Sequence, residues 1–112
     1  MKSYTDISQS KKLVEILPLE SADMYYPYNG IETYPDVKNG LETETFILCW
    51  SLAALLNVIP GGQVNRMLNS DKWEASSWND SDFEPQMSVE GFDKPVDACY
   101  ELILKLHELK ML

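Results

Sequence analysis

The amino-acid sequence predicts a small α+β domain, in which three helices pack in two layers on a three- or four-stranded antiparallel sheet. Apolar residues recur at helical spacing near the beginning, middle and end of the chain, whereas residues 86–92 alternate between apolar and polar. The 112 residues fit a single domain, 1–112. A chain of this size buries roughly 65% of its unfolded surface, so it can form a core without a metal ion or a disulfide bond.

The first helix is predicted over residues 5–17. Thr5 or Asp6 can cap its amino end, and Gln9 follows Asp6 at the spacing of a capping box. Pro18 ends this helix, because proline has no N–H to donate and crowds the preceding turn. The apolar side of the helix consists of Ile7, Leu13, Val14 and Leu17.

A short strand is predicted at the end of residues 19–26. The following residues, 27–46, contain two Asn-Gly pairs and two prolines, a composition that favours turns over regular structure. The sequence therefore predicts a long loop here, and loops of this length are often functional.

The second helix is predicted over residues 47–59 as the most buried element. Its apolar side chains point in several directions, and Trp50 is expected in the core. Ser51 either caps this helix or lies in its first turn. Pro60, Gly61 and Gly62 end it.

Residues 63–92 are predicted to form strands joined by polar turns. The candidate strands are 64–68, 73–78 and 86–92, with a turn at 79–82. In the last strand, Met87 and Val89 share one face and polar residues occupy the other. This pattern predicts an antiparallel hairpin or meander with one face in water.

The third helix is predicted over residues 93–110. Asp93 is the expected cap, and Pro95 stands in the first turn, where proline is tolerated. The apolar face of this helix, which includes Ile103 and Leu106, is expected to lie across the sheet with the second helix beside it.

Three segments taken together resemble a known family. They are DISQSKKLVEILP with ESADMY (6–18 and 20–25), CWSLAALLNVIP (49–60) and PVDACYELILKLHEL (95–109). In this order they are similar to short uncharacterised bacterial proteins of gut anaerobes, which are often associated with phage or mobile elements. The resemblance implies a shared small α+β domain and carries over no catalytic or binding residues.

The charge balance restricts the classes of partner. The chain has 18 acidic and 9 basic residues, and residues 71–101 alone hold nine acidic against two basic ones. Such a field repels nucleic-acid phosphates and anionic membranes, so the sequence predicts that the protein binds neither. With no apolar stretch long enough to span a bilayer and no signal peptide, the expected location is the cytoplasm.

The residues that could carry chemistry are few. Cys49 and Cys99 lie in apolar segments and are expected to be buried thiols without a disulfide bond. Either thiol could pair with His107 as a nucleophile, although His107 lies two helical turns from Cys99. The acidic residues of 80–84 alternate as in a calcium loop but lack its glycine. We therefore predict no catalytic residue, no metal and no cofactor.

Aromatic residues give the best sequence indication of an interaction surface. Tyr28 and Tyr34 lie in the long loop, where they either form a contact surface or pin the loop to the core. Trp73 and Trp78 are expected on opposite faces of one strand, so at least one of them points away from the core.

Three functions remain open at this stage. The preferred hypothesis is a non-enzymatic interaction or accessory module that binds an unidentified protein. The second is an acidic inhibitor that mimics nucleic acid, which requires carboxylates spaced along one face. The third is a small enzyme that uses a Cys/His pair. Self-association through an open sheet edge, giving a homo-oligomer, is compatible with each of them.

Overall fold

The computed structural model describes residues 2–27, 34–37, 47–78 and 85–112. In chain order these residues form α1 (Ile7–Val14), the short 3-10 helix η1 (Leu19–Ser21), β1 (Met24–Tyr26), β2 (Asp36–Val37), β3 (Ile47–Cys49), α2 (Leu52–Val58), β4 (Gln63–Arg66), β5 (Trp73–Ser77), β6 (Met87–Phe92) and α3 (Pro95–Glu108). The strands form two three-stranded antiparallel sheets, with the orders β2-β1-β3 and β4-β5-β6. The α+β class with three α-helices is confirmed, but the structure adds a second sheet that the sequence did not predict.

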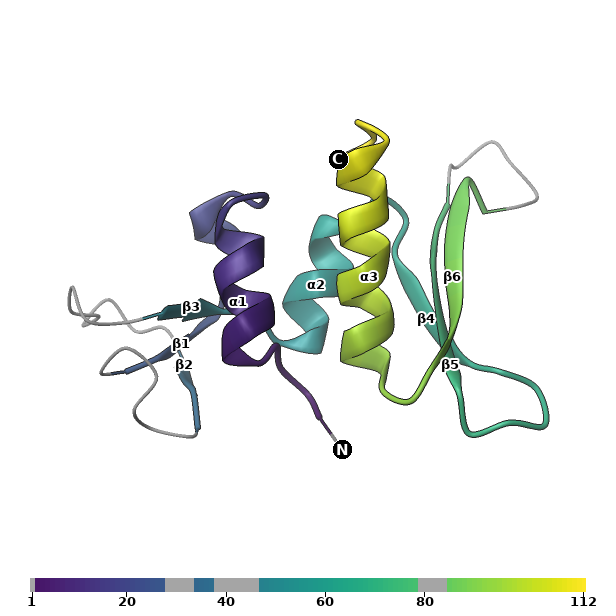
Figure 1. Ribbon diagram of the computed structural model, residues 1–112, viewed down its shortest axis with the longest axis horizontal. Helices are drawn as coiled ribbons and strands as arrows, with labels where there is room; N and C mark the ends of the chain where they lie inside the picture. The colour runs from purple at the N-terminus through teal and green to yellow at the C-terminus, as the bar shows by residue number, and fades with distance from the viewer. Residues whose placement is uncertain (1, 28–33, 38–46, 79–84) are drawn as a thin grey trace.

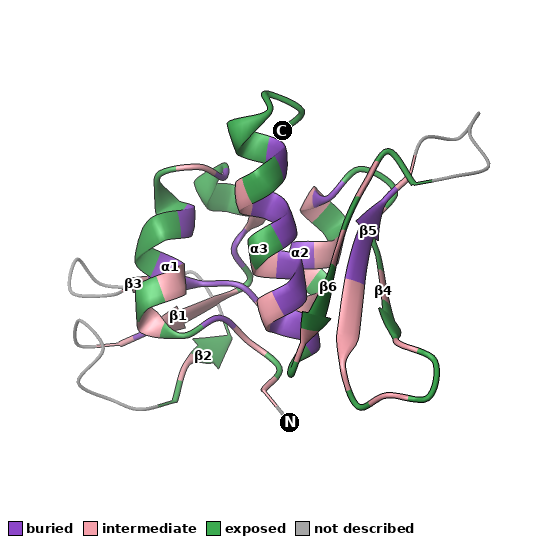
Figure 2. Cartoon of the chain, turned by 45° about the vertical axis from the view of Figure 1, so that its right-hand side comes forward, coloured by how far each residue is buried: buried purple, intermediate pink, exposed green. Residues whose placement is uncertain are grey.

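The two sheets lie at opposite ends of the molecule, with α2 and α3 between them (Figure 1). α1 packs on β3, α2 packs on α3, and α3 crosses β5 and β6, as expected for the third helix. Buried residues are concentrated on α3 and β5 (Figure 2). The core consists mainly of Leu13, Trp50, Leu55, Ala75, Val96, Leu102, Ile103 and Leu106.

α1 begins with the predicted capping box. The Gln9 N–H donates to the Asp6 carboxylate at 2.8 Å, and the Asp6 N–H donates to the Gln9 side-chain oxygen at 3.0 Å. The helix ends at Val14, three residues earlier than predicted. A residue that precedes proline is disfavoured in the helical conformation, which explains why the last turn before Pro18 is irregular.

The predicted helix over 47–59 was wrong at its beginning. Residues 47–49 form β3, which pairs with β1 so that Cys49 lies opposite Met24. α2 starts only at Leu52, after Ser51, whose hydroxyl accepts a hydrogen bond from the Ala54 N–H at 3.2 Å. A short apolar run fits a strand and a helix equally well. Here the pairing with β1 makes residues 47–49 a strand. β1 also pairs with β2, which lies within the predicted loop 27–46.

The second sheet is the predicted antiparallel meander. One of its faces packs on α3, and β6 contains a bulge. Trp73 pairs with Phe92 but Ala75 pairs with Val89, so β6 has one extra residue between them. Gly91 provides the positive φ of 89° that the bulge requires. The predicted turn 79–82 lies outside the described residues.

α3 differs from the prediction in its cap and in its burial. Lys94 occupies the N-cap position without a side-chain hydrogen bond, and Asp93 forms an ion pair with Lys72 instead. Pro95 is the first helical residue, as predicted. Seven residues of α3 are buried against one of α2, so α3 is the most buried helix. It packs on all three strands of the second sheet, whereas α2 packs mainly on α3.

Candidate functional site

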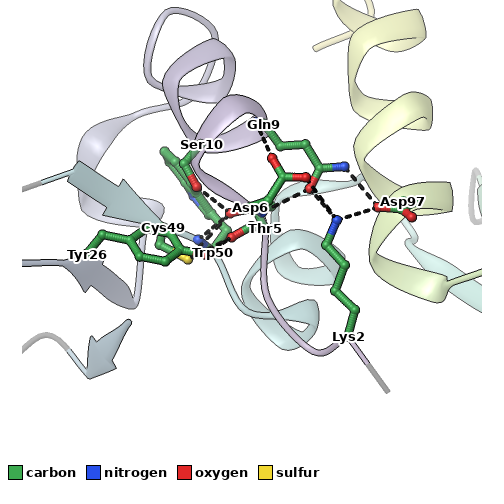
Figure 3. A network of polar contacts seen from close by, with 9 residues as sticks. All are labelled: Lys2, Thr5, Asp6, Gln9, Ser10, Tyr26, Cys49, Trp50 and Asp97. Atoms are coloured by element: carbon green, nitrogen blue, oxygen red, sulfur yellow. Dashed lines mark hydrogen bonds and ion pairs between the residues drawn. The ribbon is translucent and has the colours of Figure 1, made fainter. Parts of the chain in front are cut away.

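A buried polar network fastens the amino-terminal segment to β1 and β3 (Figure 3). The Thr5 hydroxyl lies 2.8 Å from the Ser10 hydroxyl and accepts a hydrogen bond from the Trp50 N–H at 3.1 Å. The Thr5 carbonyl accepts hydrogen bonds from the Tyr26 hydroxyl at 2.7 Å and the Cys49 thiol at 3.3 Å. Within the described residues, no buried side-chain nitrogen or oxygen lacks a partner. The network therefore stabilises the fold and leaves no such atom free for a ligand.

The two thiols are both free and buried, as predicted. Burial raises the pKa of the Cys49 thiol above its usual value and raises that of Cys99 to about 12. Since the thiolate is the nucleophile, both sulfurs are held in the unreactive form. His107 is exposed in the last turn of α3, and no hydrogen bond of the described chain joins it to either thiol. The described hydrogen bonds do not assemble the Cys–His pair that was considered as an alternative.

A second polar cluster ties the amino terminus to α3. The Lys2 ammonium donates to the Asp97 carboxylate at 2.7 Å and to the Gln9 side-chain oxygen at 2.9 Å. The Gln9 amide donates to the same carboxylate oxygen at 2.9 Å. Burial by itself raises the pKa of Asp97, but the hydrogen bonds from Lys2 and Gln9 outweigh it and lower the pKa. This cluster also has a structural role, because its charges neutralise one another.

The predicted aromatic surface is not assembled as one patch. Tyr34 is 75% exposed just before β2, whereas Trp73 lies in β5 of the second sheet, at the other end of the molecule, and Trp78 directly follows β5 (Figure 1). Trp73 is half-buried against the core, and the half-buried Trp78 donates its indole N–H to the Ser76 hydroxyl at 2.9 Å. Tyr28 lies outside the described residues.

An apolar hollow lies between α1, η1 and β3. It encloses about 360 Å³, at the lower end of the range for ligand pockets, about 300–1,000 Å³. Its described lining consists of Lys11, Val14, Leu19, Ile47 and Leu48. Four of these five side chains are apolar, so the hollow favours an apolar group.

Sequence reasoning missed this hollow because it placed Val14 on the core side of the first helix. In the structure Leu13 and Leu17 are buried, whereas Val14 is 39% exposed and Leu19 is 50% exposed. The signal was present in the sequence: Leu13 and Val14 are adjacent, so both cannot face the same way on a helix. Only the pairing of β3 with β1 brings Ile47 and Leu48 to the same place.

The described ranges contain neither a metal-binding group of side chains nor a membrane-spanning helix. No group of three or more His, Cys, Asp or Glu side chains there is arranged to hold a metal ion. The acidic residues of 80–84, which resemble the start of a calcium loop, lie outside those ranges. No helix within them is long and apolar enough to cross a membrane.

Comparison with known proteins gives no relative from which a function could be transferred. No protein-family model matches the chain, and neither does any curated protein or any solved structure. The resemblance to short bacterial proteins therefore stays a prediction, and the function must be argued from the site itself.

Proposed function

We propose that the protein is a non-enzymatic interaction domain that binds a segment of a partner protein in the hollow between α1, η1 and β3. The observation that carries this proposal is the exposed apolar wall of the hollow, where Val14 and Leu19 keep 39% and 50% of their surface in water. A partner that covers these side chains gains the free energy of removing apolar surface from water. No chemistry is required for such a role.

The charge beside the hollow defines what kind of segment fits. Lys11 is part of the lining, and Lys12 is exposed next to it in the last turn of α1. Lys12 has Glu15 at 3.5 Å, whereas Lys11 forms no ion pair with any described residue. The best ligand is therefore a peptide segment that carries an apolar side chain next to a carboxylate.

Two observations lead us to prefer this role over the alternatives. Acidic mimicry of nucleic acid needs a row of free carboxylates, but Asp93 and Asp97 are each engaged by a lysine, Lys72 and Lys2 respectively. Glu90 lies on β6, a different element from α3, which carries Asp97. An enzyme with a Cys/His pair needs an accessible thiol, whereas both sulfurs are buried.

The proposal can be tested by titrating the protein with the peptide acetyl-Leu-Leu-Asp-amide and recording amide chemical shifts. We expect shifts confined to Lys11, Val14, Leu19 and Leu48, and no comparable shifts with acetyl-Ser-Ser-Asp-amide or acetyl-Leu-Leu-Lys-amide. Leu19→Ser should abolish the response. Leu109→Ser is the matched control, because Leu109 has the same 50% exposure but lies at the end of α3. Shifts that are equal for all three peptides, or spread over the protein, would refute the proposal.

A further inference from the structure

The hairpin that joins β4 and β5 presents a single apolar side chain to solvent. Leu68, at its tip, is 91% exposed, the largest value among the exposed large apolar residues of the described chain. The tip is well ordered by its own hydrogen bonds: the Met67 N–H donates to the Lys72 carbonyl at 2.8 Å, and the Ser70 N–H donates to the Met67 carbonyl at 3.2 Å. Asn69 adopts the left-handed conformation, with φ of 56°, that such a tight turn needs. Leu68 is therefore held outward on a defined scaffold.

The hairpin tip carries the two groups that the hollow is proposed to bind, an apolar side chain and a carboxylate. Leu68 supplies an apolar side chain, and Asp71, exposed on the same tip, supplies a carboxylate three residues later. Asp71 has no ion-pair partner in the described structure, since Lys72 beside it pairs with Asp93. Lys11 at the hollow is likewise unpaired. The unpaired carboxylate of Asp71 thus lies beside the apolar Leu68, and the unpaired ammonium of Lys11 lies beside the apolar hollow.

A single molecule cannot join these two features itself. The hollow lies beside the first sheet, and the hairpin tip lies at the far end of the second sheet, along the 44 Å axis of the molecule (Figure 1). The contact can form only between two molecules. Because the two surfaces differ, the contact joins unlike patches: it forms once in a head-to-tail pair or twice in a pair related by a two-fold axis.

We propose that the segment bound in the hollow is the β4–β5 hairpin tip of a second copy of this chain, with Leu68 in the hollow and Asp71 paired with Lys11. This inference rests on the proposed function and names the partner for the same site. A stable protein–protein interface buries about 1,200–2,000 Å² of surface. One side chain and one ion pair bury far less than that. The association is therefore weak and increases with protein concentration, and its ion pair contributes less as salt is added.

Sedimentation velocity over a range of protein concentrations tests the proposal. The wild-type protein should show a weight-average sedimentation coefficient that rises with concentration. Leu68→Ser and Leu19→Ser should each weaken self-association at least about tenfold, since burying a leucine side chain contributes that much. Leu109→Ser, with the same exposure as Leu19, should behave as the wild type.

Mixing the two defective variants gives a sharper result. The Leu68→Ser variant keeps the hollow and the Leu19→Ser variant keeps the tip, so together they should form a one-to-one heterodimer that cannot extend further. Lys11→Asp and Asp71→Lys should each weaken association, and the double variant should restore it. Leu68, Leu19, Lys11 and Asp71 all have exposed side chains, so these variants should fold, which circular dichroism will verify.

The outcomes separate this inference from the proposed function. A wild-type protein that stays monomeric at every concentration, or a Leu68→Ser variant that associates as the wild type does, overturns the inference. If acetyl-Leu-Leu-Asp-amide still shifts the residues of the hollow, the proposed function stands and another protein is its partner. If the peptide does not bind either, both proposals fail.

Discussion

Replacing Gly61 with alanine should destabilise the protein more than the same replacement of Gly91. Both glycines have positive φ, 57° and 89°, which an alanine residue rarely adopts. Only their surroundings differ. A Cβ atom on Gly61 would lie 2.2 Å from the backbone oxygen of Trp78, whereas a Cβ on Gly91 would have no atom within 4 Å. The pair therefore separates backbone strain from steric crowding.

The expected magnitudes follow from these two terms. Positive φ alone costs an alanine residue about 1–3 kcal/mol, which is the whole effect expected for Gly91→Ala. Gly61→Ala adds the displacement of the Trp78 backbone, whose N–H lies 3.2 Å from the Pro60 carbonyl and 3.3 Å from the Gly61 carbonyl. Losing these two bonds costs about 0.5–1.5 kcal/mol each, and the contact must relax by nearly 1 Å. We expect the two variants to differ by about 2 kcal/mol.

Urea unfolding measures this difference. With an m-value of about 2 kcal/mol per molar urea, the midpoint of Gly61→Ala should lie about 1 M below that of Gly91→Ala. Equal m-values will show that the unfolded states are comparable. If the two midpoints coincide, the close approach of Gly61 to Trp78 does not limit the substitution, and the reasoning is refuted.

Three further predictions concern the core, the thiols and the Lys2 cluster. Leu106→Ala should lower the unfolding free energy by about 2–5 kcal/mol, because Leu106 is buried. Leu109 is half-exposed, so Leu109→Ala should change the unfolding free energy by less than about 1 kcal/mol. Similar values for the two variants would show that this face of α3 is not core. Neither Cys49 nor Cys99 should react with a thiol reagent near pH 8 until the protein is unfolded in urea, because burial raises both pKa values; rapid labelling of the native protein would contradict this. Asp97→Asn should lower the thermal midpoint at neutral pH and lower it less near pH 3. The folded-state pKa of Asp97 is lowered, so its contribution is fully present above the usual carboxyl pKa and is lost as the pH falls through the folded-state pKa. A difference that is constant over this pH range would refute it.

Local signals in the sequence determined a good part of the fold. The capping box of Asp6 and Gln9, the end of α2 at the Pro60 turn, and Pro95 in the first turn of α3 were all predicted correctly. So was the alternation that turns Met87 and Val89 inward. Each of these features depends on residues within a turn of one another, and the sequence contains that information directly.

Contacts between distant residues decided the rest. Residues 47–49 became a strand because β1 pairs with them, and Asp93 lost its predicted capping role to an ion pair with Lys72. The hollow combines side chains of α1, η1 and β3, so no single segment of the sequence reveals it. The physical reason is that periodicity and capping act along the chain, whereas strand pairing and burial join segments far apart in it. Local preferences were strong enough to place the helices, and only tertiary packing could determine which apolar residues stayed in water.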